Sequence, residues 1–248
     1  MVAVFVHGVP ETPAVWEPLL AHVSRADVVA LQLPGFGAPA PTGWTATKEE
    51  YVAWLIAELE AIGEPVDLVA HDWGGGFGVR VATTRPDLLR SWVTDVTGLF
   101  HPDYQWHAFA QIWQTQGEGE KYFADTLALP PETRAELYES VGMTPDVALT
   151  LGRAIDDEMA SCILRLYRSS VQPALAEWGR LAEKAAARPG MALCPSADPF
   201  AGDNTLAIDM GHRMGARVVE LEGAGHWWML HDPAAKAALL HEFWSTVD

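Results

Sequence analysis

The chain has 248 residues, of which 49% are hydrophobic and 20% are charged, a composition typical of a soluble globular protein. Its formal net charge of -17 argues against nucleic acid or an anionic membrane as a partner. Two cysteines, Cys162 and Cys194, provide neither a disulfide framework nor a zinc pattern. The N-terminal apolar run lacks the basic region of a signal peptide, and no run has the length of a membrane span. We therefore expect a cytoplasmic protein.

Short apolar runs alternate with helical patterns along most of the chain. An apolar run without polar alternation is typical of a strand that is buried on both faces of a parallel sheet. Strands followed by helices indicate a parallel sheet with helices on both sides. We predict strands at residues 2–6, 28–31, 66–70, 92–96, 191–193 and 218–221, and helices at residues 16–22, 48–62 and 233–247.

The strand pattern is interrupted after Gly98. Residues 101–187 contain helical patterns and no convincing strand, and prolines and glycines divide them into four to six pieces, roughly. We interpret this segment as a helical cap that is inserted into an α/β core. The predicted domains are a first core part at residues 1–97, a cap at 98–187 and a second core part at 188–248.

The apolar run at residues 66–70 meets a group of glycines, and a helical pattern follows. Strand, sharp turn and helix are the layout of the nucleophile elbow G-x-S-x-G, here with Ala70 and Gly74 as the small residues and Asp72 in place of serine. A carboxylate that attacks an ester carbonyl forms an anhydride that readily reverts, whereas attack on a saturated carbon forms a stable alkyl ester. The elbow therefore favours chemistry at an sp³ carbon over an esterase. An isolated aspartate at this position would simply cap the helix.

Hydrolysis of such an ester requires a base to activate water and a carboxylate to orient the base. His226 and Asp198 each follow a predicted strand, so both are expected at the same edge of the sheet as Asp72. Nucleophile, acid and histidine also follow one another in the order of the α/β-hydrolases. Asp95 and Asp203 are weaker candidates for the acid.

Three motifs resemble the α/β-hydrolase superfamily, in particular the branch of epoxide hydrolases and haloalkane dehalogenases. Residues 7–12 (HGVPET) resemble the oxyanion loop of that branch, residues 71–75 (HDWGG) its nucleophile elbow, and residues 225–227 (GHW) its histidine loop. The resemblance implies the α/β-hydrolase fold, a mostly parallel sheet flanked by helices with an inserted helical cap, and no cofactor or metal. One departure is that the β-hairpin with which family members begin is missing before the first strand, so we expect a smaller sheet.

The resemblance also implies the roles of individual residues. Asp72 corresponds to the nucleophile, His226 to the base and Asp198 to its partner. The backbone N–H groups of Val9 and Trp73 correspond to the oxyanion hole, which stabilises negative charge on an oxygen.

The cap decides which leaving group the enzyme accepts. Opening an epoxide forms an alkoxide, which needs a hydroxyl donor. Tyr167, in the segment LRLYR, matches the Tyr-Arg motif that carries one such tyrosine in the family. The second tyrosine of the family falls on Phe109 here, with Tyr104 as a possible substitute. We expect the substrate to contact residues Tyr104, Trp106, Phe109, Trp113 and Trp227.

Release of a halide instead needs N–H donors, which Trp73 together with Trp106 or Trp113 offers. Against that alternative, Val9 stands where many dehalogenases have asparagine. A fluoroacetate specificity is disfavoured because Trp73 occupies the place of the arginine that binds the substrate carboxylate. A catalytically silent binding protein has no positive support. We predict an epoxide hydrolase, with haloalkane dehalogenase as the alternative, that takes a small apolar substrate and is a monomer or homodimer.

Overall fold

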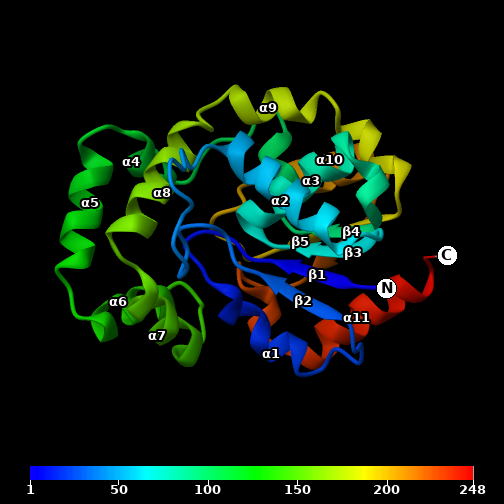
Figure 1. The fold of residues 1–248 in the computed structure, drawn as a ribbon, viewed down its shortest axis with the longest axis horizontal. Helices are drawn as coiled ribbons and strands as arrows, with labels where there is room; N and C mark the ends of the chain where they lie inside the picture. The colour runs from blue at the N-terminus through cyan, green and yellow to red at the C-terminus, as the bar shows by residue number, and fades with distance from the viewer. Residues whose placement is uncertain (248) are drawn as a thin grey trace.

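A single parallel sheet forms the centre of the computed structural model, which describes residues 1–247 (Figure 1). Its strand order is β2-β1-β3-β4-β5-β6, and every neighbouring pair is parallel. No antiparallel strand precedes β1 within residues 1–247, and β2 pairs only with β1 there. The strands are β1 (Ala3–Val6), β2 (Val28–Leu31), β3 (Val66–Ala70), β4 (Leu89–Thr94), β5 (Gly190–Pro195) and β6 (Arg217–Leu221).

Burial follows the position of each strand in the sheet. β1, β3 and β5 are buried along their whole length, whereas the edge strands β2 and β6 are partly exposed. Because helices cover both faces of the central strands, their sequences are nearly continuous apolar runs. β4 begins at Leu89, three residues before its predicted start. The apolar pattern missed this beginning because Arg90 and Ser91 are polar, and both donate hydrogen bonds to the buried Asp67 of β3.

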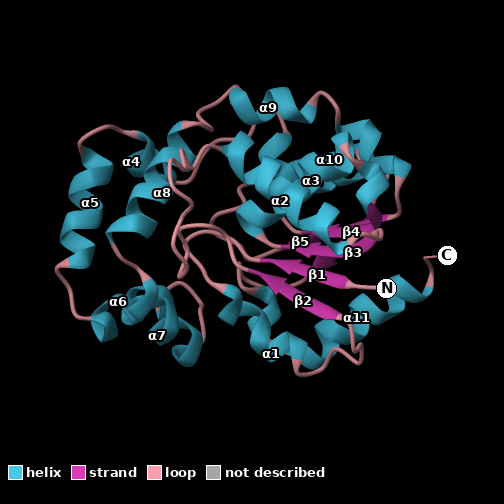
Figure 2. Ribbon diagram, viewed as in Figure 1, coloured by secondary structure: helices cyan, strands magenta, loops and turns pink. Residues whose placement is uncertain are grey.

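Helices cover both faces of the sheet (Figures 1 and 2). The side chain of Thr47 caps the start of α2, and Gly63, with φ 80°, ends it in the left-handed conformation, so this helix has its predicted bounds. α1 (Glu17–Leu20) and α11 (Pro233–Ser245) lie on one face, and α2 (Lys48–Ile62), α3 (Asp72–Thr84) and α10 (Asn204–Arg213) lie on the other.

A group of helices stands beyond the carboxyl ends of the strands (Figure 2). We call this group, from α4 to α8, the cap. No strand occurs between residues 101 and 187. The end of the predicted cap range packs against the core instead, since α9 contacts the turn at Thr97–Phe100 and the 3-10 helix at Ala182–Ala187 contacts α3. The helices of this segment are α4 (Ala108–Gln114), α5 (Glu118–Leu127), α6 (Pro131–Glu139), α7 (Pro145–Ala154), α8 (Asp157–Arg168) and α9 (Ala174–Gly179).

The predicted fold class, a parallel sheet flanked by helices with an inserted helical segment, is confirmed. Among residues 1–247, no helix combines the length and the apolar character that crossing a membrane requires. Five loops leave the carboxyl ends of β1, β3, β4, β5 and β6 on the side that faces the cap. The loops after β1, β5 and β6 carry Val9, Asp198 and His226, and the turn after β3 leads into Asp72.

Candidate active site

The turn between β3 and α3 holds Asp72 in a strained conformation. Its φ is 49°, in the left-handed region that few residues other than glycine adopt. Two glycines permit the close packing of this turn. A Cβ on Gly74 would lie 2.5 Å from the carbonyl oxygen of His7, and a Cβ on Gly8 would overlap the Cβ of Asp72. Only glycine therefore allows the loop after β1 to approach the turn so closely, and the Asp72 side chain projects from its apex.

Hydrogen bonds hold both the backbone and the side-chain carboxylate of Asp72. The backbone N–H of Val9 donates to Asp72 Oδ1 at 2.8 Å, and the backbone N–H of Asp72 donates to Asp95 Oδ1 at 3.0 Å. The Asp72 side chain is 15% exposed. Burial raises the pKa of Asp72 to about 6, although the nearby His226 and His71 oppose the shift. The carboxylate is therefore both fixed in position and poorly solvated, two properties that favour reactivity.

His226 lies opposite this carboxylate. Its Nδ1 donates to Asp198 Oδ2 at 2.8 Å, and its Nε2 lies 3.9 Å from Asp72 Oδ2. Asp198 also accepts hydrogen bonds from the backbone N–H groups of Phe200 and Ala201. Burial opposes the charge on Asp198, but His226 and these donors hold its pKa below the usual range. The bond at Nδ1 leaves Nε2 free to face Asp72, which is the orientation of a general base.

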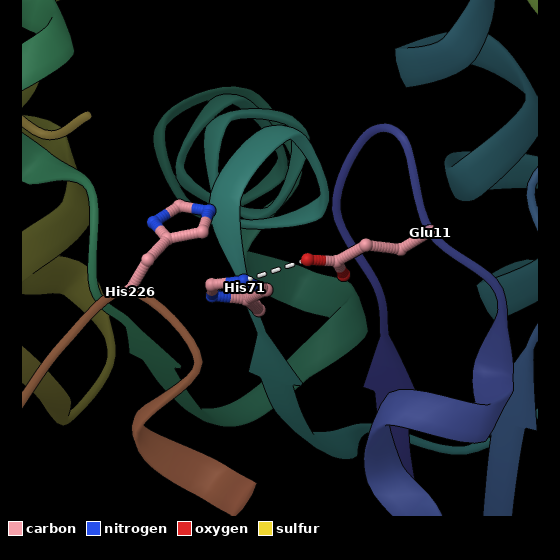
Figure 3. Close-up of side chains that lie close together, drawn as sticks. All are labelled: Glu11, His71 and His226. Atoms are coloured by element: carbon pink, nitrogen blue, oxygen red, sulfur yellow. Dashed lines mark hydrogen bonds and ion pairs between the residues drawn. The ribbon is translucent and has the colours of Figure 1, made fainter. Parts of the chain in front are cut away.

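A buried ion network that we did not predict lies beneath Asp72. His71 Nδ1 bonds to Asp95 Oδ2 at 2.5 Å. Figure 3 shows the bond on the other side of the ring, from His71 Nε2 to Glu11 Oε1 at 3.0 Å. Burial alone would lower the pKa of His71, but Asp95 and Glu11 raise it well above its usual value. Burial likewise opposes the charge on Glu11, yet His71 brings the pKa of that carboxyl to about 2. His71 is therefore an imidazolium between two carboxylates.

The network joins the loops that carry the site. Glu11 accepts from the backbone N–H of Gly8 at 2.7 Å and from Trp227 Nε1 at 2.6 Å, which ties the loop after β1 to the histidine loop. Asp95 accepts from Trp228 Nε1 at 2.5 Å. The sequence contained a signal for these residues, because His71 and Glu11 lie inside the motifs that flank Asp72 and Val9. The sequence contained no such signal for Asp95, which only the tertiary structure places beside His71.

Three ligand-type side chains, Glu11, His71 and His226, come close enough to hold a metal ion (Figure 3). The ligand atoms of Glu11 and His71 already serve the network. Glu11 Oε1 accepts from both His71 and Trp227, and both ring nitrogens of His71 bond to carboxylates. A protonated histidine also has no lone pair for a metal. The group therefore fits a hydrogen-bonded network better than a metal site.

A cavity of about 80 Å³ lies between the cap and this network. Aromatic rings form most of its wall, and Asp72 and His226 form part of its floor. Besides Asp72 and His226, five residues that the sequence predicted are at its wall, and six others were not predicted. The predicted ones are Val9, Phe109, Trp113, Tyr167 and Trp227, and the others are Pro10, His107, Tyr122, Leu137, Tyr138 and Phe200.

Three other predicted residues do not line this cavity. The Tyr104 hydroxyl donates to the carbonyl of Phe200 at 3.2 Å, and Trp106 Nε1 donates to the carbonyl of Ser170 at 3.2 Å. Trp73 is buried, with its ring edge to face against Tyr167 at 5.3 Å. Rings from the core and the cap thus pack together around Tyr167. No sequence pattern distinguished the cap aromatics that pack in this way from those that reach the cavity.

An elbow that bears a reactive side chain, with a histidine and its carboxylate on neighbouring loops, defines the class as the α/β-hydrolases. A model of the Alpha/beta hydrolase family matches residues 3–239. The chain therefore belongs to this family and is a hydrolase of the α/β fold.

The curated relatives differ in the activity that their names give, and they include a lipase of Mycobacterium tuberculosis, a haloalkane dehalogenase and an epoxide hydrolase. The chain is 34% identical to a haloalkane dehalogenase of Bradyrhizobium diazoefficiens over 36% of this chain and 29% of that protein. It is 33% identical to Epoxide hydrolase 2 of Siraitia grosvenorii over 36% and 30% of the two chains. These matches span about a third of the relatives' length. The solved structure of haloalkane dehalogenase DbeA from Bradyrhizobium elkani superimposes with a TM-score of 0.76 at 20% identity, over 99% of this chain and 91% of that one. At that identity the likeness shows the fold alone.

Proposed function

We propose that the protein hydrolyses a small epoxide to a vicinal diol through a covalent ester on Asp72. The observation that carries this proposal is a carboxylate at the elbow with His226 Nε2 on one side and the Tyr167 ring at the same cavity. The cavity volume of about 80 Å³ has room for only a handful of water molecules. Together with the aromatic wall, this size favours a substrate with few carbon atoms and little polarity.

In the first step, Asp72 attacks one carbon of the epoxide ring. A C–O bond forms as the ring C–O bond breaks, and the electron pair passes to the ring oxygen. Tyr167 gives its hydroxyl proton to that oxygen and stays a phenolate until the second step returns a proton to it. Burial raises the pKa of Tyr167 well above its usual value, so the hydroxyl stays protonated until an alkoxide forms.

In the second step, His226 Nε2 takes a proton from water, and the hydroxide adds to the carbonyl carbon of the Asp72 ester. The N–H of Val9, which already donates to Asp72 Oδ1, stabilises the oxyanion of the tetrahedral intermediate. As the intermediate collapses, His226 gives the proton that it took from water to the departing alkoxide, which leaves as the diol. The proton that remains on Asp72 passes to the Tyr167 phenolate, so the carboxylate and the tyrosine hydroxyl are both restored. Asp198 holds the histidine in the required tautomer throughout.

Isotope labelling tests the covalent route directly. In a single turnover in H₂¹⁸O, the label should enter the Asp72 carboxylate and not the diol, because water attacks the ester carbonyl. The measurement is mass spectrometry of the product and of the peptide that contains Asp72. Label in the diol after one turnover would show that water attacks the epoxide directly, and would refute the covalent proposal.

A second test interrupts the cycle after the first step. His226→Gln retains Asp72 and should alkylate once and then stall, so intact-mass spectrometry should detect an adduct of the substrate. Asp72→Asn provides the matched control, in which no adduct forms. We suggest 1,2-epoxypropane and 1,2-epoxybutane as substrates, with 1-bromopropane and 1-bromobutane alongside.

Halide release is the second candidate function, because one observation favours it. The indole N–H of Trp113 is buried without a hydrogen-bond partner, and its ring lies at the cavity wall. A halide needs only such N–H donors. Tyr167→Phe should lower epoxide turnover by about 10²–10⁴-fold, the range of general acid catalysis, and leave bromide release nearly unchanged. If the protein is a dehalogenase, Trp113→Phe should lower the rate of bromide release, and Tyr167→Phe should not.

A further inference from the structure

The cap supplies fewer hydroxyl donors to the cavity floor than two-tyrosine chemistry requires. Phe109, which occupies the predicted position of the second tyrosine, has no donor and is 39% exposed. The Tyr104 hydroxyl is committed to the Phe200 carbonyl, and Tyr104 does not line the cavity. If Tyr167 acted alone, the alkoxide would have a single partner in a site of low polarity.

A histidine is present where a second donor is needed. His107 lines the cavity together with Asp72 and Tyr167. Its ring centroid lies 6.3 Å from that of Tyr167 and 5.3 Å from that of Phe200, with both contacts edge to face. Phe200 in turn packs against His226 at 5.1 Å. His107 therefore lies between the cap tyrosine and the aromatic ring that covers the base.

The local structure fixes which nitrogen of His107 carries the proton. His107 is the N-cap residue of α4, and its Nδ1 accepts a hydrogen bond from the backbone N–H of Ala110 at 3.2 Å. An accepting Nδ1 has no hydrogen, so in the neutral ring the hydrogen is on Nε2. Burial, and the nearby His226, lower the pKa of His107 to about 4. The ring is therefore a neutral donor at Nε2 near pH 7.

We propose that His107 is the second hydrogen-bond donor to the leaving group, with Nε2–H acting beside the hydroxyl of Tyr167. This assignment rests on the proposed function. His107, Asp72 and Tyr167 line the same cavity of about 80 Å³, so an epoxide that is bound against Asp72 has both donors at the wall of its site. When the ring C–O bond breaks, Tyr167 transfers its proton to the oxygen, whereas His107 keeps its proton and only donates a hydrogen bond. A neutral imidazole in this role stabilises developing negative charge without a change in its own protonation.

Two other tyrosines at the cavity wall fit this role less well. Tyr122 and Tyr138 share the wall with Phe109 and Leu137, both of which are more than a third exposed, so this part of the wall is the outer one. Burial raises the pKa of Tyr138, and the charges that act on it besides are those of Tyr122 and Arg134, not those of the catalytic groups. Because both tyrosines line the cavity, the matched control is instead His22→Asn, at an exposed histidine that does not line it.

The test uses His107→Asn, which separates the two functions of the side chain. Asparagine is a favoured N-cap residue and can still accept from the Ala110 N–H, so α4 should be retained. Its side chain is too short to reproduce the Nε2 donor. We expect the single-turnover alkylation rate to fall on the order of 10²-fold, as for the loss of one oxyanion donor, with unchanged thermal stability. His22→Asn, the same substitution at an exposed histidine outside the cavity, should retain the parent rate within about twofold, since surface substitutions away from a site usually change little.

Dependence on the leaving group distinguishes a donor from a structural residue. The probes are 1,2-epoxypropane and its 3,3,3-trifluoro analogue, which are similar in size but differ in the basicity of the alkoxide that forms. If His107 stabilises that alkoxide, His107→Asn should slow the unfluorinated epoxide more than the fluorinated one. An equal loss with both substrates would assign His107 a purely structural role and overturn the inference.

The failure of this inference is separable from that of the proposed function. Parent protein that opens epoxides while His107→Asn retains its rate within about twofold would refute the role of His107 and leave the function standing. Parent protein that forms no diol from either epoxide would refute the proposed function, and the assignment of His107 would be withdrawn with it. His107→Gln, which can place an amide N–H farther out, should recover part of the lost rate if a donor is what matters.

Discussion

Replacing Asp72 by asparagine should stabilise the fold at neutral pH while it abolishes turnover. Burial raises the pKa of Asp72 from 3.8 to about 6, so the native state binds this proton more tightly than the unfolded state does. Stability from such a group is fully present below pH 4 and is lost as pH rises to about 6. Above that range, the native protein contains a poorly solvated carboxylate.

The size of the effect follows from the shift in pKa. About two units correspond to about 3 kcal/mol, and we expect about 2–3 kcal/mol because the side chain retains some contact with solvent. For a chain of this length, that is a rise in melting temperature of roughly 5–10 °C. Asparagine also tolerates the φ of 49° better than most residues do, so the backbone adds no cost.

Chemical denaturation at pH 7.5 and at pH 4 measures both halves of this prediction. Asp72→Asn should exceed the parent in unfolding free energy at pH 7.5 and match it near pH 4. Asp72→Ala is the matched control, because it removes the same charge but strains the turn by about 1–2 kcal/mol and leaves the Val9 N–H without its partner. Equal stability of Asp72→Asn and the parent at pH 7.5 would refute the argument that the site stores strain in a buried charge.

Three further changes probe the same site. The single-turnover alkylation rate should fall about tenfold for each pH unit below about 6, because only ionised Asp72 attacks; a rate that is flat down to pH 5 would contradict the raised pKa. Glu11→Gln should weaken the hydrogen bonds that Glu11 accepts from the Gly8 N–H and from Trp227 Nε1. We expect kcat to fall about tenfold or more, and the unfolding free energy in urea titration to fall by about 2–4 kcal/mol. An unchanged kcat would show that the network does not position the site. Gly8→Ala should abolish alkylation, since its Cβ would overlap that of Asp72, and residual activity above about 10% would show that the loop after β1 can move aside.

The sequence by itself determined the architecture and the order of the site residues. Continuous apolar runs predict buried parallel strands, because helices cover both faces of such a sheet and side chains on either face are therefore apolar. Since the carboxyl ends of parallel strands lie on one edge, the positions of Asp72, Asp198 and His226 in the chain are enough to predict that they meet there. The bond between His226 and Asp198 at 2.8 Å and the Val9 N–H on Asp72 have the geometry that those positions imply.

The sequence pattern predicted neither the early start of β4 nor the buried network. Arg90 and Ser91 are polar, so their sequence is typical of a loop. They belong to the strand because Asp67 of the neighbouring strand accepts their hydrogen bonds. In the same way, Glu11, His71 and Asp95 come from three loops, and the positive charge of His71 compensates the two buried carboxylates that contact it. Such compensation depends on distances between segments that are far apart in the chain.

Tertiary structure alone decided which cap residues reach the cavity. The helices of the cap pack against one another and against the core. Aromatic side chains are suited to both interfaces, so their presence in the sequence does not tell which of them reach the cavity. Tyr104 and Trp106 donate to the backbone carbonyls of Phe200 and Ser170 and do not line the cavity, whereas His107, next along the chain, lines the cavity and caps α4 through its Nδ1. All three residues precede α4 in a segment without helix or strand, where no periodic sequence pattern tells which side chains face the cavity.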